Sequence, residues 1–101
     1  MNMKISSVEK TIIPVLRKYG VSQASLFGSI VRDEMKNGSD IDILVKLPDN
    51  IHGFDYIDLR LNLQEELEKK LKRKVDLVEF DYIKSSLKKY ILTGQRLIYA
   101  K

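Results

Sequence analysis

The sequence contains no cysteine. Disulfide bonds, zinc–thiolate sites and cysteine nucleophiles are therefore excluded. His52 is the only histidine, which argues against a histidine-rich metal site or a histidine-based catalytic triad. The chain also lacks the run of roughly 18 apolar residues that a membrane-spanning helix needs, and its start, MNMKISSVEK, has no apolar signal-peptide core. We therefore expect a cytoplasmic protein that does not enter the membrane.

Length and composition fit one small domain. The chain has 101 residues, of which 44% are hydrophobic, so residues 1–101 are predicted to form a single domain with one core. Its 18 basic and 14 acidic residues give a net charge of +4. Much of the basic excess lies at 68–74 and at Lys84, Lys88 and Lys89, as expected for solvated helix ends. Nucleic acid is therefore not an expected partner, whereas an anionic ligand or an acidic protein surface stays open.

Helix and strand patterns alternate along the chain, without internal repeats or low-complexity linkers. Leucines at 59, 63, 67 and 71 recur every four residues and predict one buried stripe of a helix, facing either the core or a homodimer partner. The expected helices cover 6–19, 30–35 (ended by Asn37-Gly38), 56–71 and either 81–94 or 85–94, the expected strands cover 23–27, 40–47 and 74–80, and an apolar tail follows at 97–99. This order predicts an α/β (α+β) domain of two or three layers around one small sheet.

Two aspartates share one side of the expected strand at 40–47. Successive side chains of a strand point to opposite faces, so Asp40 and Asp42 should point the same way, about 7 Å apart at their Cα atoms. Carboxylates this close repel each other unless a cation neutralises them, and an all-oxygen site suits Mg²⁺ or Mn²⁺. Asp76, in another expected strand, would join them if the two strands pair side by side.

Gly28-Ser29 stands where the strand at 23–27 ends and a short helix is expected. Such a turn leaves main-chain N–H groups unpaired at the positive end of a helix, which attracts phosphate. Glycine lets the backbone approach a ligand closely, and the Ser29 hydroxyl is a further donor. A phosphate-binding turn ten residues before a carboxylate pair predicts metal-assisted phosphoryl or nucleotidyl transfer.

The arrangement Gly28-Ser29, ten residues and then Asp40-Ile41-Asp42 resembles the signature of the DNA polymerase β-like nucleotidyltransferases. The wider stretch FGSIVRDEMKNGSDIDILV and the chain length most resemble the minimal nucleotidyltransferase (MNT) family, the MntA-type antitoxins that pair with HEPN-domain toxins. The likeness extends from the first expected helix to the closing LTGQRLIY. It implies a polymerase β palm-like nucleotidyltransferase fold, with a small mixed β-sheet flanked by helices.

Six residues match functional positions of that family. They are the catalytic carboxylates and metal ligands Asp40, Asp42 and Asp76, the triphosphate-binding Gly28 and Ser29, and the nucleotide-binding Arg32. A structural role for Arg32, beside an acid such as Asp42, fits its place in the sequence as well. The family often has a second arginine where Ile30 stands and a glycine where Asp33 stands, and these departures bear on triphosphate affinity but leave the three carboxylates intact.

The resemblance also implies a reaction. Members of the family transfer AMP from ATP to a tyrosine hydroxyl of the cognate HEPN toxin and thereby silence it. We therefore expect a metal-dependent protein adenylyltransferase that acts as an antitoxin, with Mg²⁺ or Mn²⁺ as cofactor. Two alternatives stay open: a non-catalytic module that neutralises its toxin by contact alone, and a nucleotidyltransferase that modifies a small molecule. Enzymes of the second kind resemble longer chains with an added helical domain, for which this length leaves no room.

Overall fold

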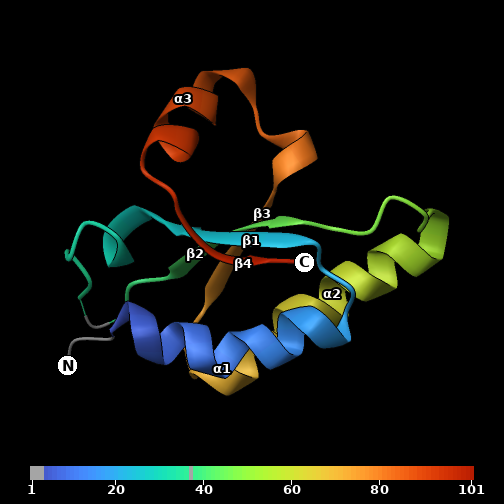
Figure 1. The fold of residues 1–101 in the computed structure, drawn as a ribbon, viewed down its shortest axis with the longest axis horizontal. Coiled ribbons are helices and arrows are strands. Elements are labelled where there is room, and N and C mark those ends of the chain that lie inside the picture. The colour runs from blue at the N-terminus through green and yellow to red at the C-terminus, as the bar shows by residue number, and fades with distance from the viewer. Residues whose placement is uncertain (1–3, 37) are drawn as a thin grey trace.

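The elements follow the alternation of helices and strands expected from the sequence (Figure 1). The computed structural model describes residues 4–36 and 38–101. The elements of that part are α1 (Ile5–Lys18), β1 (Gln23–Phe27), the 3-10 turn η1 (Gly28–Ile30), β2 (Ile41–Lys46), α2 (Gly53–Leu71), β3 (Val75–Glu79), the 3-10 turn η2 (Phe80–Tyr82), α3 (Ser85–Thr93) and β4 (Arg96–Ala100).

The strands form one mixed sheet in the order β3-β2-β1-β4. β2 and β3 run parallel, whereas β1 is antiparallel to both of its neighbours, β2 and β4. A parallel pair needs a long crossover connection, and α2 supplies it between β2 and β3. The prediction of a small mixed sheet flanked by helices is therefore confirmed.

The apolar tail expected at 97–99 belongs to a strand. β4 (Arg96–Ala100) pairs with β1, so that Leu26 lies opposite Arg96 and Gln23 lies opposite Ala100. Three apolar residues are too few to show the alternation typical of a strand, so their pattern did not predict one. Pairing supplies hydrogen-bond partners to the main-chain groups along that side of β1.

The prediction of a helix at 30–35 is wrong. The chain makes only the single turn η1 here, and this turn begins earlier, at Gly28. The main-chain N–H of Arg32 donates to the Gly28 carbonyl at 3.2 Å. Asp33 then has a φ of 56°, which a right-handed helix does not allow. Asn37, part of the expected helix stop, lies outside the described residues.

The later helices differ from expectation mainly at their starts. α2 begins at Gly53, earlier than the leucine pattern indicates. Of the two starts considered for the last helix, Ser85 is correct, since Asp81 lies in η2. No helix within residues 4–36 and 38–101 is long and apolar enough to cross a bilayer.

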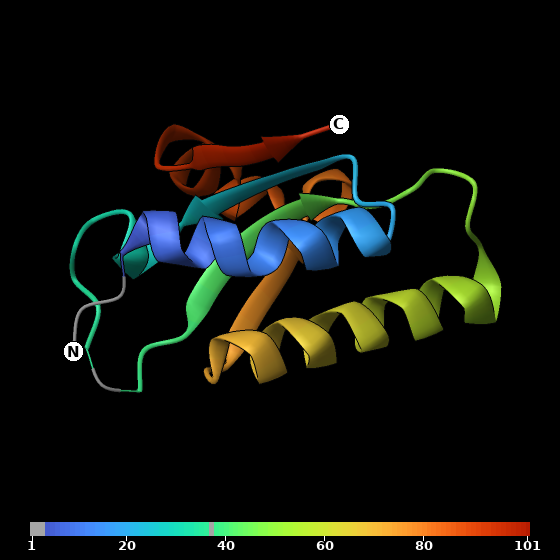
Figure 2. The same ribbon diagram turned by 60° about the horizontal axis from the view of Figure 1, so that its bottom comes forward.

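Two helices cover one face of the sheet. α1 and α2 pack against that face, as Figure 2 shows, and the main hydrophobic core lies between them and the strands. The leucine stripe of α2 lies in this core, with Leu63, Leu67 and Leu71 buried and Leu59 partly buried. The core interpretation of the stripe is therefore confirmed.

The other face of the sheet is covered by the short helix α3 (Figure 1). Phe27, Leu44 and Ile91 form a small hydrophobic cluster there, separate from the main core. Because nine helical residues cannot cover a four-stranded sheet, side chains near the strand ends on this face stay open to solvent.

Candidate functional site

Asp42 and Asp76 lie side by side on the face of the sheet that α3 covers. Parallel pairing of β2 with β3 places Asp42 directly opposite Asp76. The residues before and after each of them are buried in the main core on the far face, as the alternation of a strand requires. Asp42 is partly buried and Asp76 is exposed. The expected pairing of the two strands is confirmed.

Asp40 lies at the edge of this pair. It precedes the first residue of β2 and is exposed, so the sheet does not fix the direction of its side chain. After burial and the charge of Asp76, the charge of Asp40 also raises the pKa of Asp42. Over the described ranges, no three Asp, Glu, His or Cys side chains are gathered closely enough to chelate one ion. The expected convergence of three carboxylates is thus realised as a pair, with Asp40 beside it.

Gly28 brings the backbone of η1 against Asp42. Its φ is +77°, in the left-handed region that favours glycine. A Cβ at this position would lie 2.0 Å from Asp42 Oδ2 and 2.9 Å from Asp42 Cγ. The turn can therefore approach the carboxylate only because residue 28 has no side chain.

The Ser29 hydroxyl, expected to bind phosphate, donates to the thioether sulfur of Met35 at 3.1 Å. Ser29 is partly buried and is not among the residues that line the pocket beside Asp42. Because a thioether is a weak acceptor, a phosphate oxygen can compete with it for this hydroxyl. The single turn of η1 provides a smaller dipole than the helix that the sequence predicts there.

Arg32 contacts an acid and a tyrosine instead of the paired aspartates. Its Nε donates to Glu34 Oε1 at 2.8 Å, and its Nη1 donates to the Tyr90 hydroxyl at 2.6 Å. Its positive charge lowers the pKa of Asp42, so Arg32 lies near the pair without binding it. The acid that pairs with Arg32 is thus Glu34 and not Asp42, the example given in the prediction. The contact with Tyr90 was not predicted, because no sequence pattern links these two positions.

A pocket of about 280 Å³ opens where α3 meets the sheet. Asp42 and Asp76 form its acidic side. The rest of its lining is apolar or aromatic and comes from Phe27, Val78, Leu87, Tyr90 and Ile91. The pocket suits a ligand that has a charged part and a flat apolar part.

The pKa of Asp42 is raised to about 6. Burial contributes most to this shift, followed by the negative charges of Asp76 and then Asp40, while Arg32 opposes it. Like charges in one site destabilise the ionised form of each carboxyl group. A cation bound at the pair would relieve this repulsion.

The sequence matches the family Polymerase beta, Nucleotidyltransferase over residues 10–101. The matched range includes the glycine turn, the paired aspartates and Asp40. The chain belongs to the polymerase β nucleotidyltransferase family. The pocket lined by Asp42 and Asp76 lies within the matched range.

Two relatives of this nucleotidyltransferase come from archaea. A Methanocaldococcus jannaschii protein assigned as a protein adenylyltransferase is 43% identical over 90 residues, which cover 89% of this chain and 92% of the relative. The protein adenylyltransferase MntA of Thermococcus cleftensis is 39% identical over 75 residues, which cover 74% of this chain and 72% of the relative.

Solved structures share the fold of this nucleotidyltransferase. A crystal structure of a toxin–antitoxin with AMP-PNP has a TM-score of 0.75 and 27% identity, over 92% of this chain and 73% of that chain. A complex of a tri-AMPylated Shewanella oneidensis HEPN toxin with an MNT antitoxin has a TM-score of 0.70 and 26% identity, over 95% of this chain and 72% of that chain. The expected nucleotidyltransferase fold is confirmed.

The carboxylates of the nucleotidyltransferase fit a hard divalent cation. Asp42 and Asp76 provide oxygen donors on adjacent strands, and Mg²⁺ and Mn²⁺ prefer oxygen donors. Burial, and then the charges of Asp76 and Asp40, raise the pKa of Asp42 more than Arg32 lowers it. Asp40 lies in the chain two residues before Asp42, at the edge of this pair.

The contribution of Asp42 to the stability of the metal-free nucleotidyltransferase should increase as the pH falls from about 7 to about 4. The pKa of Asp42 is about 6 in the folded state, against an ordinary value of 3.8. Between these values the folded state binds more protons than the unfolded state, so stability is lost as the pH rises through this window. We expect about 1 kcal/mol from Asp42, after allowance for solvent screening of this partly exposed pair.

Thermal unfolding in the presence of a chelator, at several pH values, measures this effect. Glu66 has a lowered pKa and contributes in the opposite direction, so the useful quantity is the difference between the wild type and Asp42→Asn. That difference should shrink as the pH falls. A constant difference across the window would contradict the prediction.

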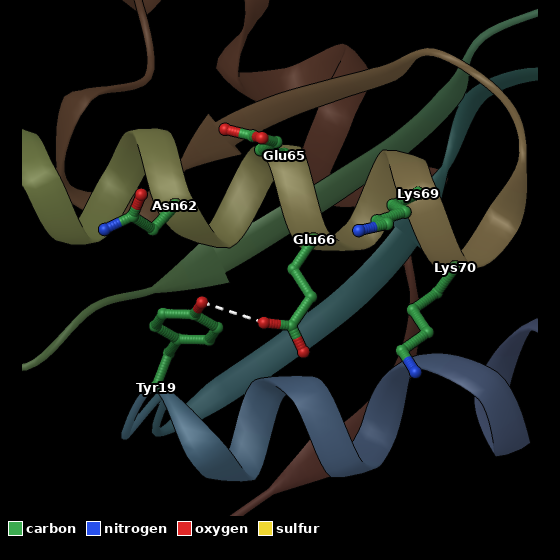
Figure 3. Close-up of a pocket in the computed structure, with 6 residues that line it drawn as sticks. All are labelled: Tyr19, Asn62, Glu65, Glu66, Lys69 and Lys70. Carbon is green, nitrogen blue, oxygen red and sulfur yellow. Dashed lines mark hydrogen bonds between the residues drawn. The ribbon is translucent and has the colours of Figure 1, made fainter.

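A second hollow of the nucleotidyltransferase, of about 540 Å³, lies between α1 and α2 (Figure 3). Tyr19, at the end of α1, donates its hydroxyl to Glu66 of α2 at 2.9 Å, and Lys18 binds the same carboxylate oxygen at 2.9 Å. These contacts join the two helices across the hollow. The residues that line it include none of the predicted site residues, so we assign it no part in the reaction.

Proposed function

We propose that this nucleotidyltransferase transfers AMP from ATP to a tyrosine hydroxyl of a HEPN-domain toxin and so acts as its antitoxin. The proposal depends on one observation, the carboxylate pair Asp42 and Asp76 directly beside the Gly28 turn. The names of relatives support it, since one is a protein adenylyltransferase MntA and another is an MNT antitoxin in complex with an AMPylated HEPN toxin. In this proposal residues 1–101 work as one domain in the cytoplasm, where ATP is available.

The glycine turn and Arg32 have the task of binding the nucleotide. Main-chain N–H groups of Gly28 and Ser29 face the triphosphate, which the absence of a side chain at residue 28 allows. Arg32 adds a positive charge beside this turn, and a guanidinium suits phosphate oxygens. The apolar wall from α3 receives the flat base of the nucleotide.

The three carboxylates have the task of charge neutralisation and proton transfer. Asp40, Asp42 and Asp76 would hold Mg²⁺ or Mn²⁺, which would neutralise the phosphates and activate the attacking hydroxyl. The acceptor oxygen attacks the α-phosphorus, and the new O–P bond forms as the bond to pyrophosphate breaks. Asp76, the more exposed member of the pair, accepts the proton of the acceptor hydroxyl.

The surface beside the pocket suits an acidic or mixed-charge protein. Lys84, Lys88 and Lys89 lie on or directly before α3 and are exposed, and α3 also supplies the apolar wall of the pocket. Complementary charges of a partner protein would guide it to this side of the sheet. Nucleic acid has no role in the proposal.

The function is tested with a HEPN-domain protein that is co-expressed with this chain and purified in complex with it. After incubation with Mg²⁺ and ATP labelled at the α-phosphate, we expect label on a tyrosine of that partner and none after chelation of the metal. An Asp40→Ala, Asp42→Ala double variant that still folds and binds the partner should lose both transfer and neutralisation.

The two alternatives predict different results in the same assay. Neutralisation that persists in the double variant would favour a module that acts by contact alone. Label transferred to a small molecule, with none on the partner, would favour a small-molecule nucleotidyltransferase. Either outcome contradicts the proposed function.

A further inference from the structure

A tyrosine of the protein itself lies in the pocket of the paired aspartates. Tyr90, on α3, lines this pocket together with Asp42 and Asp76. Its side chain is 55% exposed, so its hydroxyl is accessible to a nucleotide that binds there. The proposed function uses a tyrosine of a partner as the acceptor, and it gives the hydroxyl of Tyr90 no part in the reaction.

The Tyr90 hydroxyl is connected to both halves of the site through Arg32. The Nη1 of Arg32 donates to this hydroxyl at 2.6 Å. The main-chain N–H of Arg32 donates to the Gly28 carbonyl at 3.2 Å and so closes the phosphate-binding turn. The charge of the same guanidinium acts on Asp42. Arg32 therefore links the Tyr90 hydroxyl to the turn that would hold the triphosphate, and Tyr90 itself lines the pocket of the carboxylates.

The chemistry of this contact suits a nucleophile. The Tyr90 oxygen is the acceptor in its hydrogen bond with Arg32, so its own proton is free to pass to a base. A guanidinium stabilises the phenolate that forms as the proton leaves, and it does not itself take up a proton. The carboxylates of the same pocket are the available bases.

Other tyrosines lack this combination. Tyr19 donates to Glu66 between α1 and α2, and Tyr56 donates to Glu79. Tyr82 is 73% exposed but does not line the pocket of the aspartates. Tyr82 is therefore a matched control for exposure without proximity.

We propose that Tyr90 is a site of self-adenylylation. The proposal depends on the proposed function, because it uses the same carboxylates and the same ATP. Tyr90 Oη attacks the α-phosphorus of ATP, the Oη–P bond forms as the bond to pyrophosphate breaks, and the phenolic proton passes to Asp76. The adenylyl group then occupies the pocket, so a modified chain is blocked for transfer to a partner.

The purified chain, incubated with Mg²⁺ and ATP and with no other protein, tests this proposal by intact-mass and peptide mass spectrometry. We expect one adenylyl group per chain, on Tyr90, at a rate independent of protein concentration because the reaction occurs within one chain. The label should come from the α-phosphate of ATP and not from the γ-phosphate. Asp42→Asn lacks one of the carboxylates that the reaction needs, so it should stay unmodified and provide the mass of an unmodified chain.

Two tyrosine variants complete the experiment. Tyr90→Phe keeps the ring and its packing on α3, so it should melt like the wild type and take up no adenylyl group. Tyr82→Phe should be modified at the rate of the wild type. Adenylylation that persists in Tyr90→Phe, or label that comes from the γ-phosphate, would overturn the proposal.

The assay with the HEPN-domain partner distinguishes a failure of self-adenylylation from a failure of the proposed function. If the chain adenylylates its HEPN-domain partner but never itself, self-adenylylation is wrong and the proposed function stands. If neither protein is adenylylated, the proposed function is wrong as well.

Discussion

Asp76→Asn should fold as well as the wild type and lose AMP transfer by orders of magnitude. Asp76 is exposed at the end of the sheet beside Asp42, so its replacement leaves the core untouched. Its charge raises the pKa of Asp42, and removing that charge relieves repulsion in the metal-free protein. We expect the stability to be unchanged within about 0.5 kcal/mol or slightly higher. Transfer falls because the metal loses a charged ligand and the attacking hydroxyl loses its base.

The measurement pairs a thermal melt without metal with transfer of labelled AMP to the co-purified partner. Asp58→Asn is the matched control, because it removes the same charge from an exposed position on α2, on the other side of the sheet. This control should keep full activity. The pH dependence of stability should also weaken in Asp76→Asn, since the pKa of Asp42 moves back toward its ordinary value.

A well-folded Asp76→Asn protein with near-normal transfer would remove Asp76 from the reaction. The pairing of β2 with β3 would stand, because the register fixes it. Asp40 and Asp42 would then be the only carboxylates left for the metal among those that the sequence predicts.

Gly28→Ala should reduce both stability and transfer. Alanine at a φ of +77° strains the backbone, at a cost of about 1–3 kcal/mol. The new Cβ would also meet Asp42 Oδ2 at 2.0 Å, so either the turn or the carboxylate must move. Because the proposed reaction needs both in place, we expect transfer to fall at least about a hundredfold, as small misplacements of reacting groups do.

Gly53→Ala is the control that distinguishes the two effects of Gly28→Ala, the backbone strain and the collision of the new Cβ with Asp42. Gly53 has a φ of +61°, and nothing lies within 4 Å of the position of its Cβ. This variant should lose a similar amount of stability and keep its activity. The assays are a thermal melt and AMP transfer, each at a temperature where all variants are folded. Equal activity of the two alanine variants would show that the close approach of Gly28 to Asp42 has no part in the reaction.

Local sequence patterns predicted most of the elements and two residues of the candidate site that the sheet brings together, Asp42 and Asp76. Asp40 and Asp42 were informative because alternate residues of a strand share a face, and their spacing from Gly28-Ser29 was informative because it resembles that of the family. The leucine stripe of α2 predicted a buried face because helical periodicity determines which residues share a side. The same locality explains the errors: a short helix at 30–35 was expected where a left-handed residue, Asp33, ends the turn.

Contacts between distant parts of the chain set the remaining features. Composition and spacing determined that this chain has a glycine turn followed by strand-borne carboxylates, because these follow from neighbours in the sequence. They did not determine which acids meet, since Asp42 faces Asp76 only through the parallel register of β2 and β3. They also did not determine that Tyr90 contacts Arg32, because α3 reaches η1 only when it packs on the sheet. Strand neighbours and packed helices depend on the free energy of the whole fold, which no local pattern contains.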